Sequence, residues 1–119
     1  MPAIRNTDDK NDLLDKLSVC LNRAHWARLT CEARGRSADA AKFDKRISRL
    51  QLEIDRLIQE LLNDWTGSAA KLKDNLDAAN AGLRDAIADI EQSVKTAQNV
   101  VKAIGYIDDV LAIAADLIP

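Results

Sequence analysis

The two cysteines and the single histidine are the residues whose types could bind a metal ion or act as nucleophile and base. Cys20, His25 and Cys31 lie close together in the sequence, and thiolates with imidazole are the ligands of zinc sites. Within one helix, five residues rotate His25 by about 140° from Cys20, so the three side chains cannot converge. We therefore expect no metal site.

The same helix geometry decides the state of the thiols. Cys20 and Cys31 are eleven residues apart, which separates their Cα atoms by about 16 Å along a helix. A disulfide requires Cα atoms within about 7 Å of each other. Eleven residues are about three turns, so both sulfurs face the same side of the helix. The spacing predicts two free thiols buried in a core, where cysteine packs as a small apolar residue.

The other residue sets that enzymes use are missing from the sequence. There is one histidine, and there is no Glu-x-x-His pair, Cys-x-x-Cys motif or glycine-rich phosphate loop,. Asp85 and Asp89 share a helix face at i and i+4, which is typical of a solvated surface,. We therefore expect no enzymatic activity, no cofactor and no small-molecule substrate.

Charge offers a different chemistry, because the basic residues are concentrated in one block. Residues 21–50 hold eight Lys or Arg against three Asp or Glu, in a chain of net charge −2. Such a block can bind an acidic protein surface or a phosphate backbone. It lacks interleaved aromatic residues and the sequence pI is about 5.3, so we expect a solvated end that pairs at most with the acidic third helix of a neighbouring molecule, with binding of an acidic partner or of nucleic acid as the alternative. We call this block the basic tip: Arg28, Arg34, Arg36, Lys42, Lys45, Arg46 and Arg49.

The composition predicts the all-α fold that positions these residues. The chain has 119 residues with four glycines, and its two prolines stand at positions 2 and 119. Sheet-containing folds need turn residues at short intervals, whereas Ala, Leu, Lys, Arg and Glu favour helices. The length suits one domain. We expect a flexible N-terminus over residues 1–7 and a single helical bundle domain over residues 8–119.

Apolar residues at alternating spacings of four and three predict three long helices with coiled-coil-like packing. The pattern covers residues 13–31, 43–61 and 72–101, and Gly35 and Gly67 stand between them as helix stops,. A single long helix through Gly67 is the alternative, but Thr-Gly-Ser favours a turn. We expect an up-down-up antiparallel bundle of helices at about 8–34, 38–65 and 68–104, with a short fourth helix at 106–118 if Gly105 breaks the third.

The last dozen residues are apolar nearly all round the helix, because the apolar phase shifts after Val101. Such a helix is normally buried on all sides. Either it folds back on the bundle, or it projects and packs against another chain; we expect the second, with self-association as a dimer or larger. The candidate interface consists of Ile104, Ile107, Val110, Leu111, Ile113, Ala114, Leu117 and Ile118.

The first predicted helix also carries apolar residues on the side away from its cysteines. Val19, Trp26, Leu29 and Ala33 form this row, which we call the partner stripe. Either a later helix of the chain covers the stripe, or it binds a partner anchored by Trp26, since tryptophan is enriched among interface hot spots.

The segment Trp65-Thr66-Gly67 between two long helices resembles the W-x-G turn of small helical hairpins secreted by bacterial type VII systems. The resemblance covers about residues 40–110. It implies a secreted partner or effector. Those hairpins commonly end in Tyr-x-x-x-Asp/Glu, whereas here Tyr106 is followed by Asp109 at the third position and by Val110 at the fourth.

The sequence carries neither a signal peptide pattern nor an uninterrupted apolar stretch. Three aspartates lie within residues 1–12, and Lys102 and Asp108 interrupt the apolar residues 97–118,. We expect a cytoplasmic protein without a membrane span. The function we expect is a helical interaction or assembly module that self-associates, with the type VII hairpin and the binding of an acidic partner or nucleic acid as alternatives.

Overall fold

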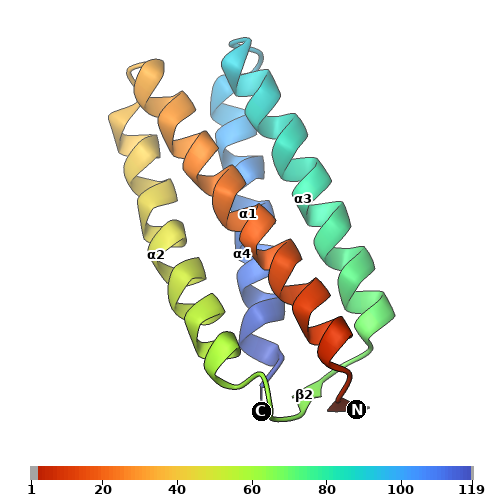
Figure 1. The fold of residues 1–119 in the computed structure, drawn as a ribbon. Coiled ribbons are helices and arrows are strands. Elements are labelled where there is room, and N and C mark those ends of the chain that lie inside the picture. The colour runs from red at the N-terminus through yellow and green to blue at the C-terminus, as the bar shows by residue number, and fades with distance from the viewer. Residues whose placement is uncertain (1–2, 119) are drawn as a thin grey trace.

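The computed structural model describes residues 3–118, which form four helices and one short strand pair (Figure 1). The all-helical prediction is confirmed. The helices run alternately up and down along an elongated bundle, whose principal extents are 44 × 22 × 18 Å. The elements are β1 (Ala3–Ile4), α1 (Thr7–Ala33), α2 (Ser37–Gln59), β2 (Trp65–Thr66), α3 (Ala69–Glu91) and α4 (Thr96–Asp116).

Each helix of the bundle has two close neighbours. α1 packs against α2 and α3, and α4 packs against the same two helices from the opposite corner. α2 and α3 therefore lie on a diagonal, and the segment that joins them crosses the end of the bundle (Figure 1). As a result, α1 and α3 are neighbours that run parallel to each other. Short connections predict only that consecutive helices are antiparallel neighbours, so they do not predict this pair.

The two predicted glycine stops stand where helices end or begin. Gly35 follows α1 with φ of 71°, and Gly67 precedes α3 with φ of 112°. Both values lie in the left-handed region, which glycine adopts without a Cβ penalty. Ser68 then caps α3, because its side-chain oxygen accepts from the backbone N–H of Lys71,.

The predicted third helix over residues 68–104 is wrong in its C-terminal part. The chain turns at residues 92–95, and Gly105 lies inside α4. The turn contains no glycine: Ser93 and Lys95 adopt positive φ values of 59° and 43°. A lone glycine within a helix costs only about 1 kcal/mol relative to alanine, so burial of the apolar face of α4 outweighs that cost.

The predicted second helix, 38–65, and the predicted flexible N-terminus, 1–7, also differ from the structure. α2 ends at Gln59, and the residues after it cross the end of the bundle with Trp65 fully buried. Ile4 of β1 pairs with Trp65 in an antiparallel register and is itself buried. The N-terminus is therefore ordered from residue 3 because β1 satisfies backbone groups of the crossing segment; residues 1–2 lie outside the described residues.

The core combines the first two predicted apolar rows, the third row as far as Ile90, and the inner face of α4, whereas Val94 and Val101 of the third predicted row are exposed. Its largest fully buried side chains come from every helix. Each contributes about 1.5–3 kcal/mol relative to an exposed side chain. Examples are Leu13 and Leu17 of α1, Phe43 and Leu50 of α2, Leu83 and Ile87 of α3, and Ile107 of α4.

Two glycines of the α3–α4 pair give a matched test of this packing. A Cβ at Gly82 would overlap the ring of Tyr106, whereas a Cβ at Gly105 would meet nothing within 4 Å. We expect Gly82→Ala to destabilise the fold by about 1–3 kcal/mol, because the Tyr106 ring must move away from its contact with α3. Gly105→Ala should stabilise it by about 1 kcal/mol. Urea unfolding followed by circular dichroism measures both, and effects of the same sign would contradict the placement of Tyr106.

Candidate interaction surfaces

The predicted C-terminal interface is part of the chain's own core. Its residues lie in α4 and just after it, against α2 and α3. The expectation of a projecting segment is therefore wrong for this chain, and the fold-back alternative is what the structure shows. Five members are at most 4% exposed, namely Ile107, Val110, Leu111, Ala114 and Leu117, while Ile104, Ile113 and Ile118 are partly buried against the core.

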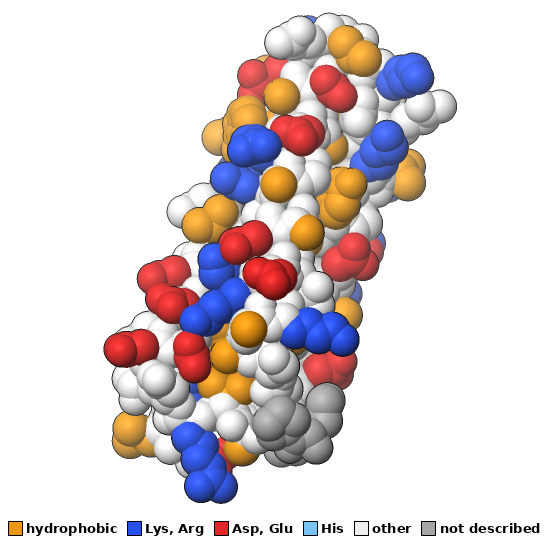
Figure 2. Space-filling view, turned by 90° about the vertical axis from the view of Figure 1, so that its right-hand side faces the viewer, with side chains coloured by type: hydrophobic (Ala, Val, Ile, Leu, Met, Phe, Trp, Pro, Cys, Tyr) orange, Lys and Arg blue, Asp and Glu red, His pale blue; other side chains and the backbone are white. Residues whose placement is uncertain are grey.

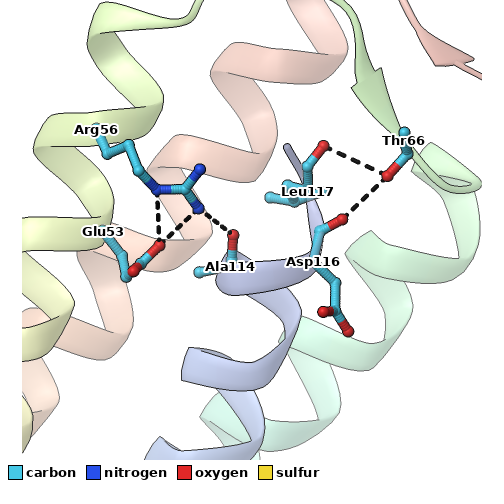
Figure 3. A network of polar contacts seen from close by, with 6 residues as sticks. All are labelled: Glu53, Arg56, Thr66, Ala114, Asp116 and Leu117. Carbon is cyan, nitrogen blue, oxygen red and sulfur yellow. Dashed lines mark hydrogen bonds and ion pairs between the residues drawn. The ribbon is translucent and has the colours of Figure 1, made fainter. Parts of the chain in front are cut away.

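Hydrogen bonds from α2 and β2 hold the C-terminal end of α4 in place (Figure 3). Arg56, itself paired with Glu53 at 2.7 Å, donates to the carbonyl oxygen of Ala114 at 3.1 Å. The hydroxyl of Thr66 donates to the carbonyl oxygen of Asp116 at 3.0 Å. The last carbonyls of a helix lack partners within the helix and carry negative dipole charge. These contacts satisfy them and tie α4 to the bundle.

Lys10 closes the same end of the bundle from inside. Its side chain is 2% exposed, and its Nζ donates to the carbonyl oxygens of Leu61, at 2.8 Å, and of Asn63. The ammonium also lies 5.7 Å from the centroid of the Trp65 ring, within the range of a cation–π interaction,. Sequence reasoning missed this residue, although Lys10 stands three residues before Leu13 in the buried row of α1 and so occupies a core position.

The structure leaves the partner stripe uncovered by α4, which lies diagonally across the bundle from α1. Val19 is 39% exposed, Leu29 is 54% exposed and Ala33 is exposed, whereas Trp26 is partly buried against the core. Val19, Trp26 and Ala33 are spaced by seven residues and therefore share one face of α1. That face borders α3, because Val19 lines a groove between the two helices.

The groove between α1 and α3 has a volume of about 610 Å³ and is walled by charged side chains. Lys16 pairs with Asp77 at 2.6 Å. Lys73 pairs with Asp9 at 2.7 Å and with Asp12 at 3.1 Å, and these hydrogen bonds raise the pKa of Lys73. In Figure 2, acidic and basic side chains accordingly mix along the lower left of the molecule, over α1 and α3. This half of the groove cross-links the two helices by ion pairs.

A buried amide continues the cross-link higher in the groove. Asn80 is 4% exposed and donates from Nδ2 to the carbonyl oxygen of Lys16 at 3.0 Å. In return, Arg23 donates to the carbonyl oxygen of Asn80 at 2.6 Å. Among the described residues, the Oδ1 of Asn80 has no hydrogen-bond partner. These reciprocal bonds fix the register of the parallel pair α1 and α3.

Two charges of this groove have no ionic partner of their own. Asp15 and Arg23 both line it, and no ion pair joins either of them to another described residue. Asp15 lies before Val19 in α1 and Arg23 lies after it. Along α1, the exposed Val19 of the groove therefore lies between the carboxylate of Asp15 and the guanidinium of Arg23, and neither group is in an ion pair with the described residues.

The basic tip is partly neutralised by neighbouring carboxylates. Arg34 instead donates to the hydroxyl of Ser93, at 2.8 Å, and so links the two turns at this end of the bundle. Lys45 and Arg49 are exposed and form no ion pair with the described residues. The paired members are Arg28 with Asp44 at 3.1 Å, Arg36 with Asp39 at 2.7 Å, Lys42 with Asp39 at 3.6 Å, and Arg46 with Asp108 at 3.1 Å.

The cysteines are free and buried, as the spacing predicts. Burial raises the pKa of Cys20 to about 12, and burial followed by the charge of Asp39 raises the pKa of Cys31. Thiolates are the reactive form, so these thiols are poor nucleophiles near neutral pH. Within residues 3–118, no three His, Cys, Asp or Glu side chains gather into a group that could hold a metal ion, and none of the helices is long and apolar enough to cross a membrane.

Comparison with known protein families, curated proteins and solved structures found no match.

The buried ammonium of Lys10 gives a direct test of how the end of the bundle is closed. Lys10→Met keeps an unbranched chain but removes the donor that Leu61 and Asn63 share. Because two carbonyl oxygens at this part-buried site then lose their shared donor, we expect a loss of about 1–3 kcal/mol in the free energy of unfolding. Lys45→Met, at an exposed site, is the control and should change it by less than about 0.5 kcal/mol. Equal unfolding midpoints for the two variants would contradict a closing role for Lys10.

Proposed function

We propose that the protein is a non-enzymatic helical module for protein–protein interaction and assembly, and that its partner docks on the α1–α3 face. This face consists of the groove together with the row of Val19, Trp26 and Ala33. One observation carries the proposal: an apolar row with Val19 and Ala33 exposed lies beside a groove in which Asp15 and Arg23 form no ion pair with the described residues. Tryptophan is enriched among interface hot spots, and Trp26 stands between Val19 and Ala33 in this row.

The proposed docking surface differs from the interface predicted at residues 104–118 because of where α4 lies. The apolar residues of its inner face lie in the core, and Arg56 and Thr66 cap its end. An interface built on residues 104–118 would require α4 to leave the bundle. The α1–α3 face requires no such change, and protein surfaces that dock a partner usually keep their backbone conformation.

The non-enzymatic part of the proposal rests on the chemistry of the groove. Its charged side chains are lysines, arginines and aspartates, most of them in ion pairs that join the helices. Both thiols lie elsewhere, in the core, with raised pKa values. Catalytic groups need a poised pKa and access to substrate, and the described side chains of the groove offer neither a thiol nor an imidazole.

The W-x-G hairpin alternative fits the geometry less well. Such a turn joins two helices that form a hairpin, whereas here the turn at Trp65 leads from α2 to α3 across the diagonal of the bundle. Trp65 is fully buried and donates from Nε1 to the carbonyl oxygen of Glu60 at 3.0 Å. Its place favours a structural role in closing the bundle.

Site-specific photo-crosslinking tests the docking surface. With a photoreactive benzophenone amino acid at Val19, we expect covalent adducts of the full chain in cells that produce it, identified by mass spectrometry. The same amino acid at Leu52, which is 69% exposed on α2, is the matched control and should give several-fold fewer adducts. Ala81→Glu in the groove should suppress the adducts formed from position 19. Equal yields from both positions, or none from position 19, would contradict the proposal.

A second candidate function is the binding of an acidic partner at the basic tip. It is favoured by Lys45 and Arg49, which are exposed and form no ion pair with the described residues, and by Arg34, which donates to a hydroxyl and not to a carboxylate. Fluorescence anisotropy with a labelled polyglutamate peptide and with a short DNA duplex separates the two kinds of partner. We expect peptide binding that weakens with salt and is lost in the triple alanine variant of these residues. The matched triple variant at Lys71, Lys95 and Lys102 should bind as the parent does. Binding to the duplex alone would make nucleic acid the partner instead.

A further inference from the structure

We infer that the α3–α4 side of the bundle holds a second docking site, whose occupant is an amphipathic helix of a partner protein with an apolar face and a basic flank. This inference goes beyond the proposed function, because none of the side chains that line this site lines the α1–α3 groove. The two sites lie on opposite flanks of α3, since α1 packs on one flank and α4 on the other. Each site can therefore be tested without the other.

Two adjoining cavities form a groove along the half of the α3–α4 pair that is next to β2 (Figure 1). The larger cavity has a volume of about 550 Å³ and the smaller one about 200 Å³, and both are lined by Ala112 and Ile113 of α4. The smaller cavity reaches Gly67 beside β2, and the larger one reaches Tyr106, whose ring contacts α3 at Gly82. We call these two cavities together the α3–α4 groove.

The walls of the α3–α4 groove are mostly apolar, and several of their side chains are small. Small side chains let the backbone of a docked helix approach closely, and an amphipathic helix laid into a hydrophobic groove is a recurring mode of recognition. The ten residues from Tyr106 to Asp116 extend over about 15 Å of α4, which matches about three turns of a docked helix. The apolar side chains of the two walls include Leu72, Ala78 and Ala79 of α3 and Tyr106, Ala112 and Ile113 of α4.

Two carboxylates give the α3–α4 groove its charge. Among the described side chains that line the two cavities, only Asp109 and Asp116 are charged. Both are exposed, and neither forms an ion pair with the described residues. The seven residues between them are two turns, so they share one face of α4 and lie about 10.5 Å apart along its axis. In Figure 3 the carboxylate of Asp116 points away from Arg56 and Thr66, and only its backbone carbonyl oxygen accepts from Thr66.

These two aspartates select a basic partner. A docked helix beside α4 has the same rise per residue, so two Lys or Arg seven residues apart on its flank meet both carboxylates. An acidic helix or an anionic lipid surface would instead face like charges, which opposes docking. The chain's own two helices supply no counter-charge inside the groove. None of their cations lines either cavity, namely Lys71, Lys73, Arg84 and Lys102.

Fluorescence anisotropy of the full chain with a labelled model peptide tests this site. The peptide has about 14 residues, or four turns, with leucines on one helical face and lysines elsewhere. Its matched control carries glutamate in place of every lysine. We expect the lysine peptide to bind about tenfold or more tightly than the glutamate peptide, and we expect its binding to weaken with salt.

Matched double variants test the role of the two carboxylates. Asp109→Asn combined with Asp116→Asn should raise the Kd of the lysine peptide about fivefold, because two exposed ion pairs are lost. Asp8→Asn combined with Asp55→Asn removes the same charge at exposed sites on α1 and α2. This control should change the Kd by less than about twofold.

A second pair of variants tests the shape of the groove without changing any charge. Ala112 and Ala115 are both exposed on α4, but only Ala112 lines the two cavities. Ala112→Gln keeps a good helix former and places a long neutral side chain between the walls, so it should raise the Kd of the lysine peptide several-fold. Ala115→Gln should leave this Kd unchanged, and circular dichroism should show the parent helix content for every variant.

Equal binding of the two peptides would overturn the inference, as would a Kd that changes neither in the Asp109 and Asp116 double variant nor in Ala112→Gln. Backbone amide shifts in NMR spectra should place the lysine peptide on α3 and α4, and shifts confined to α1 or α2 would contradict the site. A dimer of the parent chain that buries the α3–α4 groove would make a second copy the occupant and overturn the basic helix. None of these results alters the crosslinking expected from Val19, so the proposed function is tested separately.

Discussion

The burial of α4 is the constraint on which the rest of the structure depends. The inner face of α4 holds buried apolar side chains such as Ile107, Val110 and Ala114, which cannot remain in water,. The helix therefore takes the corner between α2 and α3. That position requires the chain to turn at residues 92–95 through two non-glycine residues with positive φ. It also places α4 on the diagonal from α1, so the α1–α3 face stays open. The position of α4 in the core therefore decides which surface of the bundle stays free for a partner.

The diagonal order of the helices creates a second requirement at the end of the bundle. Because α2 and α3 are not neighbours, the segment between them must cross the end of the bundle, and the backbone groups that it buries there need partners,. Trp65 fills the opening, Ile4 pairs with it, and Lys10 donates to carbonyl oxygens after α2. Thr66 reaches the end of α4 from the same segment. One crossing therefore ties together the N-terminus, α2 and α4.

Periodicity predicts much of this fold, because it reports which side of a helix is apolar. The buried rows of α1 and α2, the free thiols and the glycine stops all follow from spacing and turn chemistry. Periodicity does not report which apolar surface covers another, so it predicts the burial of residues 104–118 but not whether they pack within their own chain or against a second one. The turn at Ser93 and Lys95 carries no glycine signal. Lys10 occupies a core position in the predicted row. A charged residue normally faces solvent, so its burial cannot be predicted from the sequence without knowledge of the carbonyl oxygens that it binds.

Hydrogen exchange of the α4 backbone amides in dilute protein tests the central claim most directly. If α4 belongs to the core of its own chain, the amides of residues 107–114 exchange only through global unfolding. Their free energy of opening then equals that of the buried stretch of α1 from Leu13 to Cys20, and it does not change with protein concentration. Exchange in α4 that is much faster than in α1 when the protein is dilute, and that slows when it is concentrated, would show that α4 is buried against another chain and would contradict the account.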